Sequence, residues 1–222
     1  MAAIEVQHLH KRYGDRPAVR DVSFSVERGE LFGILGPDGA GKTTTVECVA
    51  GLRVPDGGRV SVLGLDPCRD AAELRQQVGV QLPRSGLPNR LRVGEALALY
   101  RSFYRRPADP GELMQRLGLA DQRDTAYRKL SDGQRQRLSL ALALVGGPRV
   151  AILDEPTAGL DPRARSDTWE LIEQVRDGGV TVLLVTHLLA EARRLCDRVA
   201  VIDAGRVTAV HDPTGPVSRA AP

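Results

Sequence analysis

Residues 36–43 read GPDGAGKT, a complete G-x-x-x-x-G-K-T phosphate-binding loop. This feature constrains the fold because such a loop connects a strand to a helix. The apolar run at residues 31–35 reads as the strand, and residues 44–50 read as the helix. Lys42 can reach the terminal phosphates of a ligand, and the Thr43 hydroxyl can hold Mg²⁺. A chance glycine-rich turn is the alternative, and the flanking strand and helix argue against it.

The loop and the residue after it make up the expected nucleotide-binding segment. The glycines let backbone N–H groups surround a phosphate chain, and the helix points its positive dipole end at the phosphates. Lys42 is also an expected catalytic residue. The members of the segment are Gly36, Pro37, Asp38, Gly39, Ala40, Gly41, Lys42, Thr43 and Thr44.

Two carboxylates stand at the end of another apolar run. Residues 150–153 read as a buried strand, and Asp154 and Glu155 follow it. Because a parallel strand delivers its carboxyl end to the ligand side of a sheet, we expect Asp154 to hold Mg²⁺, directly or through water. Glu155 is expected to polarise a water for attack on a γ-phosphate, a role worth about 10²–10⁴-fold in rate. An acidic pair at a turn or helix start is the alternative.

Composition limits the class of protein. The chain has 222 residues with 31 basic and 28 acidic side chains, and this balance argues against a nucleic-acid partner. No apolar run reaches the roughly 20 residues needed to cross a bilayer, and residues 4–10 alternate instead of forming a signal peptide. We therefore expect a cytoplasmic protein. Between residues 84 and 106, six arginines face one acid, which predicts either a solvated face or a surface for an anionic membrane or acidic partner.

Strand and helix patterns alternate along the chain. Strands are expected at residues 4–9, 19–26, 31–35, 59–65, 150–153, 180–185, 198–202 and 206–210. Helices are expected at residues 44–50, 93–104, 111–117, 132–145, 162–176 and 189–196. Alternation around a phosphate loop predicts an α/β fold with a mostly parallel sheet. We expect one domain over residues 1–222, with a core at 1–83 and 147–211, inserted helices at about 84–146 and a tail at 212–222.

Residues 130–134 read LSDGQ and precede a helical pattern. Ser131 and Gln134 have the spacing of a capping box, so Ser131 is expected to be the N-cap. The start of such a helix exposes N–H groups that suit a phosphate. By itself, this pattern indicates only a cap.

Five motifs, taken in order, resemble the nucleotide-binding subunit of an ATP-binding-cassette (ABC) transporter. They are the Walker A loop at 36–43, the signature at 130–134, the Walker B strand ending in Asp154 and Glu155, the D-loop at 159–161 and a switch histidine, His187. Their order and spacing fit over essentially the whole chain. The resemblance implies a P-loop NTPase of ABC type with an antiparallel β edge and an inserted helical subdomain. Residues 78–88 and 159–162 look most similar to bacterial drug- and antibiotic-resistance exporters.

The resemblance also implies roles for single residues. Tyr13 stands where the family places an aromatic ring under adenine, and such stacking is worth about 1–3 kcal/mol; a surface tyrosine is the alternative. His187 would hydrogen-bond the γ-phosphate or the attacking water, although a histidine at a strand end is more often structural. Asp161 would act across a subunit interface. The signature residues implied to complete the site of a second subunit are Ser131, Gly133 and Gln134.

The first departure from the family pattern concerns the metal. The family usually has a glutamine six positions into the run that begins at residue 78, where this chain has Pro83, and the nearest glutamine is Gln81. Proline offers neither a side-chain oxygen nor a free N–H. Either Gln81 substitutes after a local shift, because residues two apart on a strand face the same way, or this contact to Mg²⁺ is lost.

The second departure is Asp132, which stands where glycine is commonest. A carboxylate near a γ-phosphate is unfavourable at a low-dielectric interface. We expect Arg135 and Arg137 to offset it, or its side chain to point to solvent. Asp38, where asparagine is frequent, is a milder change of the same kind.

The resemblance implies an ATPase, with ATP and Mg²⁺ as cofactors, that powers an exporter. Its partners would be a separate transmembrane permease, docked near residues 83–106, and a second nucleotide-binding subunit. The protein would then lie peripherally on the inner face of the cell membrane. Two alternatives are a nucleotide-gated subunit with little hydrolysis and a non-transport ABC ATPase that works on DNA or ribosomes.

Overall fold

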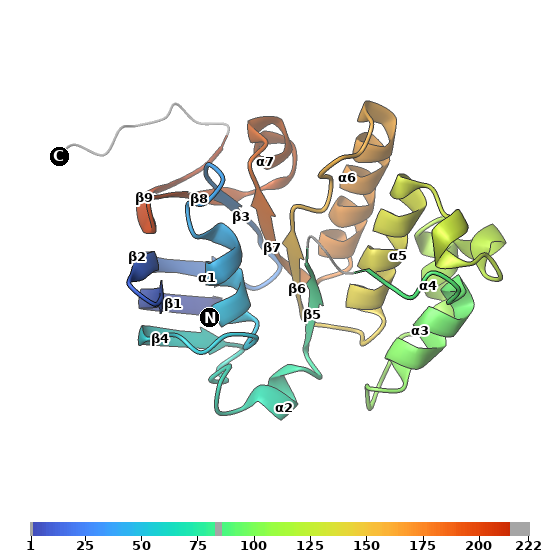
Figure 1. The fold of residues 1–222 in the computed structure, drawn as a ribbon, viewed down its shortest axis with the longest axis horizontal. Coiled ribbons are helices and arrows are strands. Elements are labelled where there is room, and N and C mark those ends of the chain that lie inside the picture. The colour runs from blue at the N-terminus through green and yellow to red at the C-terminus, as the bar shows by residue number, and fades with distance from the viewer. Residues whose placement is uncertain (1, 83–85, 214–222) are drawn as a thin grey trace.

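A single sheet of nine strands organises the molecule (Figure 1). The computed structural model describes residues 2–82 and 86–213, so Pro83 and most of the expected tail lie outside the described residues. The strand order is β4-β1-β2-β9-β8-β3-β7-β6-β5. The strands are β1 (Ala2–Tyr13), β2 (Arg16–Glu27), β3 (Leu31–Leu35), β4 (Gly57–Val62), β5 (Val78–Gln81), β6 (Val150–Asp154), β7 (Thr181–Thr186), β8 (Arg198–Asp203) and β9 (Arg206–His211).

Five strands, β8, β3, β7, β6 and β5, are mutually parallel. The strands β6 and β7 are buried along their whole length, as expected when helices cover both faces of a parallel sheet. The strands β1, β2 and β4 pair antiparallel at the other side of the sheet, and β9 pairs antiparallel with β8. The predicted α/β fold, with a mostly parallel sheet and an antiparallel edge, is therefore confirmed.

Helices pack on both faces of the parallel strands. They are α1 (Lys42–Val49), α2 (Ala71–Leu74), α3 (Val93–Arg101), α4 (Pro110–Arg116), α5 (Asp132–Leu144), α6 (Pro162–Asp177) and α7 (Leu189–Leu195). One apolar cluster joins α1 to the antiparallel strands and to one face of β3, β6 and β7. A second cluster joins the opposite face of those strands to α3–α7. Because successive side chains of a strand alternate between its faces, each buried strand contributes to both clusters.

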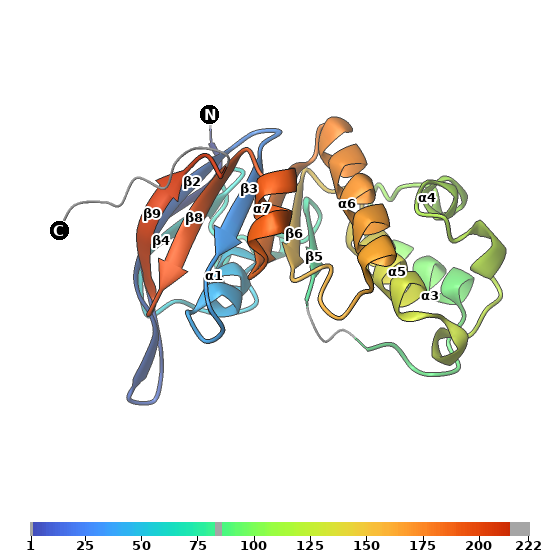
Figure 2. The same ribbon diagram turned by 90° about the horizontal axis from the view of Figure 1, so that it is seen from above.

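The helices between β5 and β6 extend away from the antiparallel strands. Figures 1 and 2 show α3 and α4 at one end of the molecule and β1, β2 and β4 at the other. This arrangement is compatible with an inserted helical subdomain at about residues 84–146, although the division itself stays a prediction. Within the described ranges, every helix is too short or too polar to cross a bilayer.

The strands expected at residues 4–9 and 19–26 are longer than expected, since β1 runs to Tyr13 and β2 begins at Arg16. Two other elements end three residues before the expected boundary, and local hydrogen bonds explain both. The strand expected at residues 59–65 ends at Val62 because the backbone turns through positive φ at Leu63 and Gly64, and Leu65 bonds back to Val62. The helix expected to reach residue 104 ends at Arg101. The three residues that follow form turns with bonds of the i to i−3 type.

Candidate functional site

The phosphate-binding loop lies between β3 and α1, and three of its glycines have backbone positions that disfavour other residues. Gly39 and Gly41 have φ values of 78° and 100°. A Cβ at Gly41 would lie 2.4 Å from the Ala18 carbonyl oxygen, and one at Gly36 would lie 2.1 Å from the Ile202 carbonyl oxygen. Since only glycine tolerates such close approach, the loop can wind tightly and expose its N–H groups to a ligand.

Lys42 begins α1 with its ammonium group held across the loop. Its Nζ donates hydrogen bonds of 2.9 Å to the carbonyl oxygens of Gly36 and Pro37, and only 5% of the residue is exposed. The Asp38 carboxylate lies 3.9 Å from the same nitrogen. An ammonium group has three N–H donors, so one remains for a phosphate oxygen. The loop thus fixes both the position and the direction of this charge.

The ends of β5 and β6 carry buried oxygens that lack partners. Both carboxylate oxygens of Asp154 and the side-chain oxygen of Gln81 have no hydrogen-bond partner within the described part of the chain. Asp154 is 0% exposed and Gln81 is 3% exposed. Gln81 pairs with Leu153 in the parallel register, so its side chain leaves the sheet on the face opposite to that of Asp154. Unpartnered buried oxygens are costly, and carboxylate and amide oxygens are the ligands that Mg²⁺ prefers.

The electrostatics of Asp154 agree with a role in cation binding. Burial raises the pKa of this carboxyl to about 6, and the neighbouring Glu155 charge adds to the shift. The nearby Thr43 hydroxyl and Lys42 ammonium oppose the shift. Thr43 and Asp154 therefore fit a magnesium ion on the face of the sheet that α1 covers. The sequence expectation also named Gln81, whose side chain starts from the opposite face. The metal role of all three residues stays a prediction.

Glu155 and His187 face each other across the carboxyl ends of β6 and β7. The His187 Nδ1 lies 3.2 Å from Glu155 Oε1. Glu155 has a φ of 50°, a left-handed conformation that costs a non-glycine residue about 1–3 kcal/mol. Its backbone N–H donates to the Val185 carbonyl oxygen at 2.9 Å. Strained backbone conformations are concentrated at functional sites, so the φ of Glu155 supports a functional role for its side chain.

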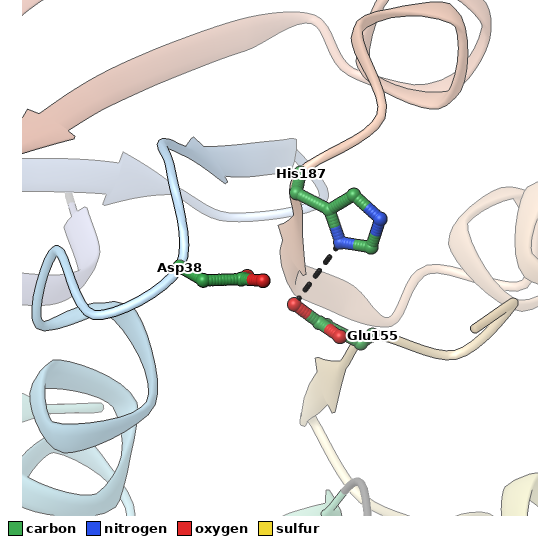
Figure 3. Close-up of side chains that lie close together, drawn as sticks. All are labelled: Asp38, Glu155 and His187. Atoms are coloured by element: carbon green, nitrogen blue, oxygen red, sulfur yellow. Dashed lines mark hydrogen bonds and ion pairs between the residues drawn. The ribbon is translucent and has the colours of Figure 1, made fainter.

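Asp38 completes a cluster with these two residues (Figure 3). Its carboxylate, the Glu155 carboxylate and the His187 ring offer ligand atoms that all lie within 4.8 Å of one another. Figure 3 shows the three side chains converging from separate segments of the chain. A water molecule beside these groups could donate its protons to the carboxylates, and the imidazole could donate to it or accept from it. The same three groups can also hold a divalent cation.

Tyr13 ends β1 beside the start of α1. Its hydroxyl lies 3.5 Å from Thr44 Oγ1, and the Arg53 guanidinium carbon lies 5.1 Å from the ring centroid. The residue is 44% exposed. This position next to the phosphate loop is the one expected of a base-stacking ring, and the role stays a prediction.

The capping box predicted at the start of α5 is confirmed. Ser131 Oγ accepts a hydrogen bond from the Gln134 backbone at 3.2 Å, and Gln134 Oε1 accepts one from the Ser131 backbone at 2.9 Å. Asp132 pairs with Arg135 at 3.1 Å, which offsets its charge as expected. Arg137 does not contribute to this offset through an ion pair, because it pairs with Asp167 at 2.7 Å.

The signature residues and Asp161 lie together on a second surface. Ser131, Gly133, Gln134 and Asp161 line one open groove of about 610 Å³. Asp161 also caps α6, since its Oδ1 accepts from the Arg163 and Ala164 backbones at 2.9 Å. The described lining of the groove comes from the start of α5 and from residues 159–167, without the phosphate loop. A single chain therefore divides the expected site residues into two groups.

Sequence reasoning missed one buried polar residue near the site. Glu191, in the first turn of α7, accepts hydrogen bonds from Thr157 and Trp169. Acids in the first turn of a helix usually face solvent and favour the helix dipole, so the sequence carries no signal for this contact beyond its distance of four residues from His187.

Comparisons with known proteins agree with this geometry. The sequence profile of the family described as ABC transporter matches residues 19–158. The chain is 42% identical over 212 residues to the daunorubicin resistance ATP-binding protein DrrA3 of Streptomyces coeruleorubidus, covering 93% of this chain and 67% of that one. It is 41% identical over 211 residues to the Nod factor export ATP-binding protein I of Burkholderia orbicola strain AU 1054, covering 93% and 69%.

A solved structure of the ATP-binding subunit of an ABC transporter superposes on this chain with a TM-score of 0.85 and 30% identity. The match covers 95% of this chain and 90% of that one. The resemblance predicted from the motifs is confirmed by these comparisons.

Proposed function

The chain belongs to the ABC transporter family as an ATP-binding subunit with ATPase activity, and we propose that it powers an exporter whose membrane path lies in a separate permease. The export direction is supported by the relatives, which act in daunorubicin resistance and in Nod factor export. One observation carries the enzymatic part. The phosphate loop, the buried Asp154 and the Glu155–His187 pair gather at the carboxyl ends of β3, β6 and β7.

Nucleotide binding would use the loop and Tyr13. The loop N–H groups and the remaining Lys42 donor would hold the phosphates, and the Tyr13 ring would stack on adenine. Thr43 and Asp154 would hold magnesium, and Gln81 would join them only after a local shift at the end of β5. When bound, this ion neutralises charge on the β- and γ-phosphate oxygens.

Hydrolysis would depend on the pair of residues drawn in Figure 3 beside Asp38. Glu155 would accept a proton from the attacking water while the oxygen of that water forms a bond to the γ-phosphorus and the bond to ADP breaks. His187, 3.2 Å from the Glu155 carboxylate, would orient the water or donate to a γ-phosphate oxygen. The strained backbone of Glu155 would keep the carboxylate pointed at this space.

A second nucleotide-binding subunit would complete the site. The groove lined by Ser131, Gly133, Gln134 and Asp161 is open and separate from the phosphate loop. The capped start of α5 would present N–H groups to the γ-phosphate bound by the other subunit. Because Arg135 neutralises Asp132, the carboxylate that departs from the family pattern would not prevent this contact.

The permease would dock on the face formed by α3 and the chain near β5. Leu99 and Phe103 are exposed large apolar residues there, and Phe103 is 63% exposed. Leu87, Tyr100 and Leu142 line an adjoining hollow. Exposed apolar groups next to a hollow are suited to binding a protein partner.

Two experiments test this function. ATP turnover per subunit should fall when the protein is diluted below its dimerisation constant, and turnover that stays constant on dilution would contradict the two-subunit site. Protein captured at low detergent from its native cells should bring down a polytopic membrane protein. Capture of ribosomes or DNA in its place would favour a non-transport ABC ATPase.

A further inference from the structure

A buried carboxylate joins three segments beside the candidate site. Glu191 on α7 is 1% exposed, and its Oε1 accepts hydrogen bonds from Thr157 Oγ1 at 2.7 Å and from Trp169 Nε1 at 2.8 Å. No ion pair to Glu191 occurs within residues 2–82 and 86–213. Burying a carboxylate without a counter-charge is costly, so both donors matter for keeping it there.

The two donors come from two segments, and only the segment of Thr157 also carries a candidate catalytic residue. Thr157 follows Glu155 by two residues and precedes Asp161 by four, in the loop between β6 and α6. Trp169 lies in the middle of α6. Glu191 itself follows His187 by four residues. The Thr157 bond therefore ties the loop that carries Glu155 to the helix that follows His187, whereas the Trp169 bond ties that helix only to α6.

We propose that Glu191 is a positioning residue that sets the placement of His187 relative to Glu155. The inference rests on the proposed function. Its physical basis is the backbone of Glu155, whose φ of 50° persists only if the surroundings determine it fully. The Glu155 backbone donates to Val185 and accepts from the Ala158 N–H within its own loop, and the Thr157–Glu191 bond ties that loop to α7. The Thr157 side chain is 1% exposed, so water cannot replace the second bond.

Two variants test the inference because each removes one donor from the same oxygen. Thr157→Val removes the bond to the loop and nearly keeps the side-chain shape, and Trp169→Phe removes the bond to α6. We expect Thr157→Val to lower kcat about tenfold or more while the ATP dissociation constant stays within about twofold. Trp169→Phe should lower Tm but leave kcat within about twofold. If kcat falls equally in both variants, in proportion to their loss of stability, the inference is overturned.

A second readout does not depend on turnover. The chain has four histidines, so the His187 ring resonances can be assigned by comparison with His187→Gln. Thr157→Val should shift these resonances in the nucleotide-free protein, and Trp169→Phe should leave them in place. Unchanged His187 resonances in Thr157→Val would overturn the inference even if the protein hydrolyses ATP. Absent ATP turnover in the wild type would overturn the proposed function alone, since the resonance test would still stand.

Glu191→Gln and Glu191→Leu add a rescue test. The glutamine amide oxygen can still accept both hydrogen bonds, so kcat should stay within about threefold of the wild type. Leucine accepts neither bond, and this variant should lose at least as much kcat as Thr157→Val. Wild-type kcat in a folded Glu191→Leu protein would contradict the inference.

Discussion

The buried carboxylate of Asp154 leads to a quantitative prediction about stability. Burial raises the pKa of this group from 3.8 to about 6 in the folded protein. The folded chain then holds the proton more tightly than the unfolded chain, so ionisation opposes folding. The destabilisation is absent below pH 3.8, grows between pH 3.8 and 6, and is complete above pH 6. A shift of about two units corresponds to about 3 kcal/mol at neutral pH.

Asp154→Asn removes this charge. The buried amide keeps polar atoms without partners, which cost about 1–2 kcal/mol, so the net gain in the free energy of unfolding at pH 8 is about 1–2 kcal/mol. The cost of the amide does not vary with pH, whereas the cost of the charge does. The difference between variant and wild type should therefore grow by roughly 1.5 kcal/mol from pH 5 to pH 8.

Urea denaturation of the nucleotide-free protein in EDTA, at both pH values, measures this difference. The exposed Asp203→Asn is the matched control and should show little change with pH. A difference between Asp154→Asn and wild type that is independent of pH would refute the reasoning that a buried, unpaired charge stands here. Mg-ATP should stabilise the wild type more than Asp154→Asn, because only the wild type keeps the carboxylate that would hold the ion.

Three further predictions concern the loop, the base and the cap. Gly41→Ala should lose about 2 kcal/mol or more of folding free energy and weaken ATP binding, because the φ of Gly41 is 100° and a Cβ would lie 2.4 Å from the Ala18 carbonyl oxygen. Urea denaturation measures the first effect and ATP titration the second. Wild-type values in both measurements would contradict the tight-loop geometry. Tyr13→Leu should raise the ATP dissociation constant roughly 5- to 100-fold, while Tyr13→Phe should leave it nearly unchanged. Titration calorimetry measures both constants, and equal ATP affinity in Tyr13→Leu and wild type would contradict stacking of Tyr13 on adenine. Ser131→Ala should destabilise the protein by about 1 kcal/mol through loss of the N-cap; a change below about 0.3 kcal/mol in urea denaturation would show that the cap carries little stability.

Features that depend on residues close together in the sequence were predictable. The strand at residues 31–35, the phosphate loop and the cap at Ser131 each follow from residues that contact one another within a few positions. The parallel sheet also followed, because alternating apolar strands and helices have few other ways to bury their faces. In these regions the local preference and the tertiary fold agree.

Features that depend on distant contacts were not predictable. The partners of Glu191 come from residues 157 and 169, and no local pattern points to them. The turn that shortens β4 depends on Leu63 adopting a φ of 54°, which a leucine rarely does, while its N–H donates to the distant Ala3 carbonyl oxygen. The pairing of Arg137 with Asp167 rather than Asp132 depends on the packing of α5 beside α6. Sequence alone gives the chemistry of these side chains but not their neighbours.

The central claim is that Glu155 activates water for hydrolysis of ATP held by the loop around Lys42. Phosphate release by wild type and Glu155→Gln, each saturated with Mg-ATP and supplied with its permease, tests this claim most directly. We expect Glu155→Gln to bind ATP as tightly as the wild type and to release phosphate at least about 100-fold more slowly. Equal rates of phosphate release from the two proteins would contradict the account.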